Sequence, residues 1–248
     1  MAPTNVLITG GNRGIGLELV KRFLAQPNTT VIAANRDPNH PSSKASADLP
    51  KGSGSKLIIV KCDAAIQADA FSAIKELETQ HGISHLDIVV ANAGFQSGFP
   101  MIKDVKRDDV IKHLDVNVFG VIAMYQATRE LLMKSPEGKP IFAPVGSAAA
   151  SLSKQPNIPN GAYGASKGLL NWYGVRINAE DEWLNTIILD PGWTQTDMGN
   201  GAATVFGHEH APVPLDESTD GLYKVLTTAT KEKYGGRVVD YTGQIMDW

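Results

Sequence analysis

The sequence of 248 residues has only one cysteine, no long hydrophobic run and no cluster of basic residues. Because Cys62 stands alone, an internal disulfide, a thiolate zinc cluster and an iron–sulfur centre are excluded. A single thiol fits a reducing compartment, and its simplest interpretation is a small buried hydrophobic side chain. No apolar stretch approaches the roughly 20 residues that a membrane-spanning helix needs, so no membrane function is expected.

Neither sign of charge dominates the chain. Its 23 Lys and Arg residues against 26 Asp and Glu residues leave a net charge of −3, and no basic block could neutralise a run of phosphates. Nucleic acid is therefore not expected as a partner. Near the start, Val6–Ile8 runs directly into Thr9–Gly11, which is too short for the core of a signal peptide. We expect a cytoplasmic protein.

The composition, with 42% hydrophobic residues, is that of an ordinary globular protein, and we expect one domain spanning residues 1–248. Short β-branched runs alternate with segments of helical period, which is typical of a parallel sheet covered on both faces. The runs predict seven strands, at Asn5–Thr9, Thr30–Ala34, Lys56–Lys61, Leu86–Val90, Pro140–Val145, Thr186–Leu189 and Arg237–Asp240. The helical periods predict helices at Gly14–Gln26, Ile66–Gln80, Arg107–Lys134, Ala162–Asp181 and Glu217–Lys231.

Two segments lack a clear period. Residues 37–55 are rich in Pro, Ser, Gly and Lys, and predict a surface connection with at most one short helix. Residues 199–214 mix Gly, Pro and His with apolar residues, late in the chain, where a lid could cover a site.

A glycine-rich turn follows the first predicted strand and opens the first predicted helix. Glycine permits a tight turn and a close approach of backbone to a pyrophosphate, whose charge the amide groups at the helix start would meet. The alternative is a turn that only packs the helix against the strand. The candidate cofactor-binding residues here are Gly10, Asn12, Arg13, Gly14, Ile15 and Gly16.

The second predicted strand is followed by Asn35 and Arg36, where an NAD-binding protein usually places an acidic residue for the ribose 2′-hydroxyl. Arg36 and Arg13 could instead converge on a 2′-phosphate, because guanidinium groups pair well with phosphate oxygens. This favours NADP(H) as the cofactor. The alternative is that both arginines are solvated surface residues.

Tyr163 and Lys167 are four residues apart and so share one face of a predicted helix. A free tyrosine has a pKa of about 10, but a neighbouring cation stabilises the phenolate and lowers that pKa. The pair predicts a general acid/base, although the same spacing also occurs in amphipathic surface pairs.

Together these motifs resemble the short-chain dehydrogenase/reductase family in its compact form, over nearly the whole chain. The resemblance implies a Rossmann-like α/β fold: a three-layer α/β/α sandwich with a seven-stranded parallel sheet in the order 3-2-1-4-5-6-7. It also implies a homodimer or homotetramer built on the long fifth and sixth helices. It rests on Thr9–Gly16, Asp63, Asn92–Gly94, Asn117, Ser147, Tyr163 with Lys167, and Pro191–Thr196, in the family's order.

The resemblance implies cofactor contacts as well as catalytic ones. Asp63 would meet the adenine, Lys167 would bind the nicotinamide ribose, and Tyr163 would stand beside it. The turn after the fourth strand would support the cofactor through Asn92, Ala93 and Gly94. The nicotinamide carboxamide would be held by Pro191, Gly192, Thr194 and Thr196.

In the reaction that the resemblance implies, Ser147 polarises a substrate carbonyl and Tyr163 protonates it. Lys167 and Asn117 restore the proton, Asn117 by anchoring a relay water. The chain is thus expected to be an NADP-dependent oxidoreductase that reduces a small-molecule ketone. Two alternatives stay open: a non-redox isomerase, dehydratase or cyclase on the same scaffold, and a nucleotide-sensing binding protein. Such sensors commonly lose the catalytic tyrosine.

A narrower resemblance is to the fungal ketoreductases typified by norsolorinic acid ketoreductase. It rests on His85–Ala93, Asp190–Gly192, Gln195–Gly199 and the terminal tryptophan. It implies an aromatic polyketide or related secondary metabolite as the substrate.

The sequence departs from the family pattern in three places. Ala91 stands where many relatives carry a second asparagine, which leaves the following turn intact. Ser147 precedes Tyr163 by an unusually long interval, so Ser151 and Ser153 are alternative candidates. Pro144 cannot donate a ladder hydrogen bond, so the fifth strand should end or bulge there.

The candidate substrate-binding residues are Phe95, Trp193 and Met198, which flank the cofactor motifs or enter the proposed lid, as do Phe99 and Phe206. Core packing is the alternative for each. His208, Glu209 and His210 lack a further ligand cluster, so we expect no metal site.

Overall fold

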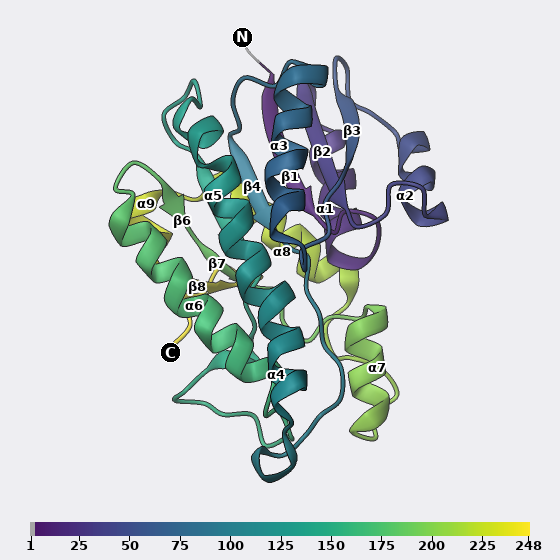
Figure 1. The fold of residues 1–248 in the computed structure, drawn as a ribbon, viewed down its shortest axis with the longest axis vertical. Helices are drawn as coiled ribbons and strands as arrows, with labels where there is room; N and C mark the ends of the chain where they lie inside the picture. Colours follow the sequence, from purple (N-terminus) through teal and green to yellow (C-terminus); the bar gives the residue numbers. More distant parts are fainter. Residues whose placement is uncertain (1–2) are drawn as a thin grey trace.

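A parallel β-sheet forms the centre of the fold in the computed structural model, which describes residues 3–248 (Figure 1). Its six strands have the order β3-β2-β1-β4-β5-β6, and every neighbouring pair is parallel. This is the order that the sequence predicts for the first six strands. The strands are β1 (Thr4–Thr9), β2 (Thr29–Asn35), β3 (Lys56–Lys61), β4 (Ile88–Ala91), β5 (Ile141–Pro144) and β6 (Asn185–Thr186).

The seven-stranded sheet that was predicted differs slightly from the observed one. The predicted strand Thr186–Leu189 is divided between β6 and β7 (Ile188–Asp190), and β7 forms a separate parallel pair with β8 (Val238–Asp240). Pro144 explains the division, because it has no N–H to donate on the side of β5 that faces β6. Beyond Pro144, the segment after β5 pairs with β7, where Gly146 N donates to Leu189 O at 2.7 Å.

Side chains alternate between the two faces of the sheet, as period-two strands require. On β1, Leu7 belongs to the core under α3, α5 and α6, whereas Val6 and Ile8 belong to the core under α1 and α8. The two cores make the three layers, and Figure 1 looks onto the layer of α3, α5 and α6. These helices are α1 (Gly14–Leu24), α3 (Gln67–His81), α5 (Gly120–Met133), α6 (Tyr163–Glu180) and α8 (Leu215–Thr228).

The predicted helix Arg107–Lys134 is interrupted. It consists of α4 (Arg107–Leu114), a π-helical turn at Asp115–Phe119, and α5. Gly120 allows the close approach at this point, since a Cβ there would lie 2.3 Å from Ala64 O. A π-helical turn redirects the side chains that it carries, and such turns are frequent at functional sites.

Of the two segments without a period, residues 37–55 have the one short α-helix that the sequence allows, and the later segment contains helix that the sequence did not predict. Residues 37–55 hold α2 (Pro41–Ala45) followed by a 3₁₀ turn at Ser46–Asp48. The lid segment begins with α7 (Asp197–Val205), whose first turn is capped by Thr196, and α9 (Lys231–Tyr234) is a further short helix. Within residues 3–248, no helix is long and apolar enough to span a bilayer.

Candidate active site

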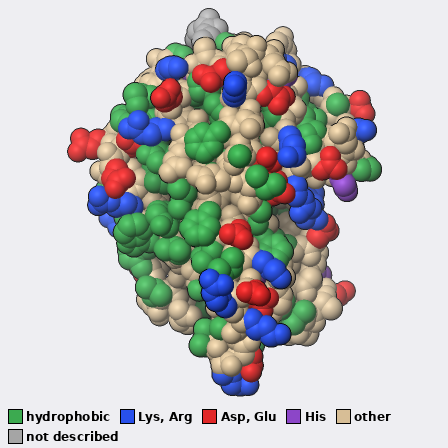
Figure 2. All heavy atoms as spheres, viewed as in Figure 1, with side chains coloured by type: hydrophobic (Ala, Val, Ile, Leu, Met, Phe, Trp, Pro, Cys, Tyr) green, Lys and Arg blue, Asp and Glu red, His purple; other side chains and the backbone are tan. Residues whose placement is uncertain are grey.

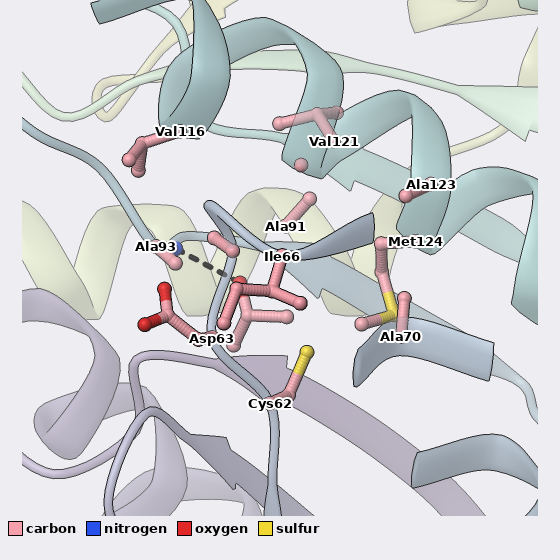
Figure 3. A pocket seen from close by; sticks show the side chains of 13 residues that line it. Cys62, Asp63, Ile66, Ala70, Ala91, Ala93, Val116, Val121, Ala123 and Met124 are labelled. Atoms are coloured by element: carbon pink, nitrogen blue, oxygen red, sulfur yellow. Dashed lines mark hydrogen bonds between the residues drawn. The ribbon is translucent and has the colours of Figure 1, made fainter. Parts of the chain in front are cut away.

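The carboxyl ends of β1, β3 and β4 surround a cavity of about 10 Å³ (Figure 3). Asp63 and Ala93 lie on one side of it, and Ala93 N donates to Thr9 Oγ1 at 2.8 Å, which joins the end of β4 to the end of β1. Cys62 lines the floor. Burial raises the pKa of its thiol to about 12, so the thiol stays protonated and does not act as a nucleophile.

The glycine turn has the backbone conformation that the motif requires. Gly10 and Gly14 have φ values of +65° and +52°, in the left-handed region that favours glycine. At Gly16 a Cβ would lie 2.2 Å from Gly10 O, so no side chain fits there. The first amide groups of any α-helix lack intrahelical partners, and at the amino terminus of α1 no side chain caps them. The turn thus forms a concave, amide-rich surface suited to an anion.

The residues around the end of β2 offer two cations. Arg36 is exposed and makes no ion pair with any described residue. Arg13 is also exposed, and its Nη1 lies 3.6 Å from Asp197 Oδ2 in the first turn of α7, a partner that the sequence did not indicate. Asn12 donates from Nδ2 to Ser42 Oγ at 2.8 Å and so ties α2 to the glycine turn.

Asn92 joins the turn after β4 to the glycine turn. Its Nδ2 donates to Thr9 O at 2.8 Å and to Gly10 O at 3.3 Å. Next to it, a Cβ on Gly94 would lie 3.7 Å from Asn117 Oδ1 and 3.8 Å from Lys167 Nζ. The turn after β4 therefore lies directly against two of the candidate catalytic residues.

Asn117 is fully buried in the π-helical turn. Its Oδ1 accepts from Phe95 N at 2.8 Å, and its Nδ2 donates to Phe95 O at 2.9 Å and to Ser166 Oγ at 3.0 Å. The side chain thus fixes the segment after β4 against α6, the helix that carries Tyr163 and Lys167.

Ser147, and not the alternative serines, meets the tyrosine. Ser147 hydrogen bonds to Tyr163 and opposes the rise of the phenol's pKa. Ser151 Oγ accepts from Lys154 N at 3.0 Å and lies 3.4 Å from Ser153 Oγ, so both alternatives are occupied within their own loop. Gly146 permits the close passage of this segment, because a Cβ there would lie 2.7 Å from Ile188 Cγ2.

Tyr163 and Lys167 share one face of α6, with Nζ 5.7 Å from the centre of the phenol ring. Burial raises the pKa of Tyr163 to about 12, and burial lowers the pKa of Lys167 to about 8. The expected lowering of the tyrosine pKa by the lysine is therefore not found: desolvation is the largest cause of the shift, and Lys167 is not among the groups that change this pKa. Nζ donates instead to Val145 O at 2.7 Å.

The loop after β7 closes the site from the other side. Gly192 has a φ of +71°, and the buried Thr194 donates from Oγ1 to Pro191 O at 2.8 Å. Thr196 caps α7 by accepting from Gly199 N at 3.0 Å, and its Cγ2 would lie 3.3 Å from a Cβ on Gly14. The two predicted cofactor segments, before α1 and after β7, therefore face each other.

The aromatic candidates form a cluster that joins two loops. Trp193 donates from Nε1 to Gly199 O at 2.9 Å, and its ring lies 6.3 Å from Phe206 and 5.6 Å from His208. Phe99, in the loop before α4, lies 4.8 Å from Phe206 in the lid. The lid segment thus contacts the loop on the opposite side of the site, while Met198 is 40% exposed.

The histidines of the sequence His208–His210 do not gather around a common point. His208 packs against Trp193, whereas His210 interacts with Gln195 Nε2 at 3.2 Å. In the described part of the chain, no three His, Cys, Asp or Glu side chains form a group that could hold a metal ion.

Two residues of the site were missed by sequence reasoning. His113 is fully buried, and its ring centre lies 6.3 Å from that of Tyr163 and 5.0 Å from that of Phe95. Its position four residues before Asn117 on a helix could have indicated this placement. Asp190, only 3% exposed, ends β7, and the sequence analysis included it in a family motif without assigning it a place in the site.

Comparisons with known proteins agree with this geometry. The family model for short chain dehydrogenase matches residues 4–204. Norsolorinic acid ketoreductase nor1 of Dothistroma septosporum is 38% identical over 99% of this chain and 92% of its own length, and short-chain dehydrogenase RED3 of Pyricularia oryzae is 33% identical over 99% and 98%. NADPH-bound carbonyl reductase from chicken fatty liver superposes with a TM-score of 0.86 at 26% identity, covering both chains completely.

Proposed function

The chain belongs to the short-chain dehydrogenase family, and we propose that it is an NADPH-dependent ketoreductase acting on a bulky, uncharged, aromatic or polycyclic ketone of secondary metabolism. The observation that carries the proposal is the convergence of Ser147, Tyr163 and Lys167 beside the glycine turn and the loop after β7. An oxidoreductase acting on C=O groups agrees with the names of the curated relatives, several of which are ketoreductases.

The residues present fit NADP(H). The glycine turn leaves no room for a Cβ at Gly16 and presents uncapped amide groups, which suits a pyrophosphate. Arg13 and Arg36 are exposed cations at the end where a 2′-phosphate would sit, and Asp63 follows β3, where it would meet the adenine. The NADPH bound in the chicken carbonyl reductase supports the same cofactor here.

When bound, NADPH supplies a hydride to the carbonyl carbon. Tyr163 keeps its proton at neutral pH, since its pKa is raised to about 12, and it donates this proton to the developing alkoxide, which is a stronger base than a phenolate. Ser147 donates a hydrogen bond to the same oxygen. Lys167 holds a positive charge 5.7 Å from the centre of the phenol ring. Asn117, whose side chain is bonded to Phe95 and Ser166, would fix the turn along which a relay water returns the proton.

The loops around the reacting centre support an uncharged aromatic substrate. Phe95 stacks on His113, which in turn contacts Tyr163, and Phe206 contacts both Phe99 and Trp193. Stacking of a substrate ring on such residues would contribute about 0.5 to 1.5 kcal/mol per aromatic pair beyond simple burial. Trp193 is held in place by its hydrogen bond to Gly199, so it offers a rigid wall. Within residues 3–248, the cations that lie over rings are at Trp183, Tyr163 and Tyr234 and not at Phe95, Phe99, Trp193 or Phe206, which favours an uncharged substrate over a carboxylate or phosphate.

The decisive experiment measures NADPH consumption with small keto acids, aliphatic ketones and polycyclic aryl ketones. We expect turnover of the aryl ketones, and Tyr163→Phe should lose at least ~10²-fold in turnover with cofactor binding little changed. Tyr173→Phe, ten residues along the same helix, is the matched control. A preference for keto acids would contradict the substrate class. If NADPH binds but no ketone oxidises it while a cyclisable precursor is transformed, the non-redox alternative takes its place.

We also propose that the protein is a homodimer, as a first step towards a tetramer. Figure 2 shows hydrophobic side chains gathered over α5 and α6, and Phe119, Leu169 and Trp172 in this region are 51%, 37% and 57% exposed. An apolar area of this kind is typical of a protein interface. Trp172→Glu should convert the assembly to monomers in analytical ultracentrifugation, whereas a monomeric wild type would contradict the proposal. A cytoplasmic location stays a prediction from the sequence.

A further inference from the structure

The long interval between Ser147 and Tyr163 forms an exposed loop that meets the tail of the chain. In the middle of this loop, residues 152–155 are all exposed. A stretch with so little burial does not keep one position by itself, because its own contacts do not offset the conformational entropy. In the described part of the chain, the polar contacts that leave this stretch for another segment go to Asp247 and Trp248.

Two contacts of different kinds join the loop to the tail. The backbone N–H of Ser153 donates to Trp248 O at 2.7 Å. The ammonium group of Lys154 lies 3.1 Å from Asp247 Oδ2. The buried Ser151 folds the loop into a turn at this point, because its Oγ accepts from Lys154 N at 3.0 Å. Two successive residues of the loop therefore bind two successive residues of the tail.

The tail itself is fixed to the core. After β8 the chain turns at Asp240, whose Oδ1 accepts from Gln244 N at 2.9 Å. The tail then runs back antiparallel to β8, where Met246 N donates to Val238 O at 2.9 Å. Val238 is buried, and β8 is paired with β7 along its length. The tail is therefore held at its base by buried structure, while its last residues reach the exposed loop.

The far part of the loop contacts the segment that carries one of the aromatic candidates. Gly161 N donates to Pro100 O at 2.9 Å, next to Phe99. Asn160 then leads into α6, since its Oδ1 accepts from Gly164 N at 3.0 Å. The loop thus connects the tail both to the segment of Phe99 and to the helix of the catalytic tyrosine.

We propose that residues 244–248 are a strap that positions the loop between Ser147 and Tyr163 and thereby determines how well a bulky ketone binds. The inference rests on the proposed function for its effect on the substrate, whereas the strap itself can be tested without turnover. A bulky ketone extends from the reacting carbon to this loop, and a small ketone does not. Because the strap orders the loop before binding, less conformational entropy is lost when the bulky ketone binds. The strap therefore acts on KM and leaves the chemical step unchanged.

Ser153→Pro removes the N–H that Trp248 O accepts, and Ser153→Ala, which keeps this N–H, is the matched control. For a polycyclic aryl ketone, we expect Ser153→Pro to raise KM about three- to tenfold, with kcat and NADPH affinity within about twofold of the wild type. KM for a single-ring aryl ketone should not change. An unchanged KM for the polycyclic ketone, or an equal change for both ketones or in both variants, would overturn the inference. A wild type without ketone turnover would instead count against the proposed function.

Hydrogen–deuterium exchange tests the strap in the absence of substrate. Asp247→Lys places a second cation beside Lys154, so the amides of residues 152–155 should exchange faster, by up to about fivefold. The double variant Lys154→Asp with Asp247→Lys restores opposite charges and should restore the wild-type exchange rate. These two variants also decide the matter if Ser153→Pro does not fold. An exchange rate that is unchanged in Asp247→Lys, or that the double variant does not restore, would overturn the inference.

Discussion

Arg13 Nη1 and Asp197 Oδ2 lie 3.6 Å apart and join the glycine turn to the first turn of α7. The two side chains are 70% and 87% exposed, so this ion pair contributes little to stability. Its position matters more than its strength. Asp197, in the first turn of α7, thus lies beside the cation that the sequence predicts for a 2′-phosphate, and an incoming phosphate competes with this carboxylate for Arg13.

Asp197→Asn should therefore tighten NADPH binding, because Arg13 no longer has a competing carboxylate. An exposed pair is worth about 0.2 to 1 kcal/mol, which corresponds to a gain of up to about fivefold in affinity. NADH affinity should not change. Fluorescence titration of both cofactors measures the effect, with Asp216→Asn as the control, which breaks a pair of similar length, 3.7 Å, between an exposed aspartate and the less exposed Arg22. Equal gains for NADPH and NADH would show that Arg13 does not serve the 2′-phosphate.

Arg36→Asp should narrow or reverse the preference for NADPH over NADH. A carboxylate at the end of β2 repels a 2′-phosphate and accepts from a 2′-hydroxyl, and each well-made arginine–phosphate contact is worth about 1.5 to 3 kcal/mol. The same titrations compare this variant with Arg237→Asp, an exposed arginine at the far strand. If the wild type binds NADPH and NADH equally, both arginines point elsewhere.

His113→Phe should raise KM for the ketone about three- to tenfold while changing kcat less. His113 Nδ1 lies 2.6 Å from Asp109 O and Nε2 accepts from Ser97 N at 3.3 Å, so the ring holds the loop after Phe95 against α4. Phenylalanine keeps the ring contact with Tyr163 but leaves the amide of Ser97 without its acceptor. Steady-state kinetics with His81→Phe as the control separates the two parameters. An unchanged KM would mean that the loop does not shape the substrate site.

Most of the fold follows from local patterns in the sequence. The alternation of β-branched runs with helical periods predicts a parallel sheet covered on both faces, and Pro144 predicts where β5 ends, because a missing N–H is a local property. The order of the first six strands was implied by the family resemblance, and the structure has the same order. A local pattern does not show which strand or residue, distant in the sequence, a segment will contact. The division of Thr186–Leu189 between two partners, and the π-helical turn within Arg107–Lys134, depend on residues distant in sequence, such as Ala64 beside Gly120.

The candidate site was predictable where the backbone conformation accepts only one residue type. The turn requires glycine at positions 10, 14 and 16, because two of them have a positive φ and the third has no room for a Cβ. His113 and Asp190 were missed because histidine and aspartate are common in helices and turns, and only the folded chain brings them to Tyr163 and Lys167. The predicted direction of the Tyr163 pKa shift was wrong, because the four-residue spacing to Lys167 does not reveal that the phenol is buried.

The last prediction concerns how Lys167 changes the free energy of unfolding with pH. Its folded pKa is lowered to about 8, against roughly 10.4 in the unfolded chain, so between these values the unfolded state binds more protons. Below about pH 8, the buried ammonium of Lys167 destabilises the folded state to its full extent. This destabilisation decreases as the pH rises and the folded state loses the proton. The wild type should therefore gain stability relative to Lys167→Met between pH 7.5 and pH 9.5, by roughly 1 to 2 kcal/mol. Urea unfolding of both proteins, kept below pH 10 because the raised pKa of Tyr163 acts in the opposite direction above it, measures this difference. A difference that stays constant across this range would show that Lys167 titrates normally and that its ammonium is accessible to water.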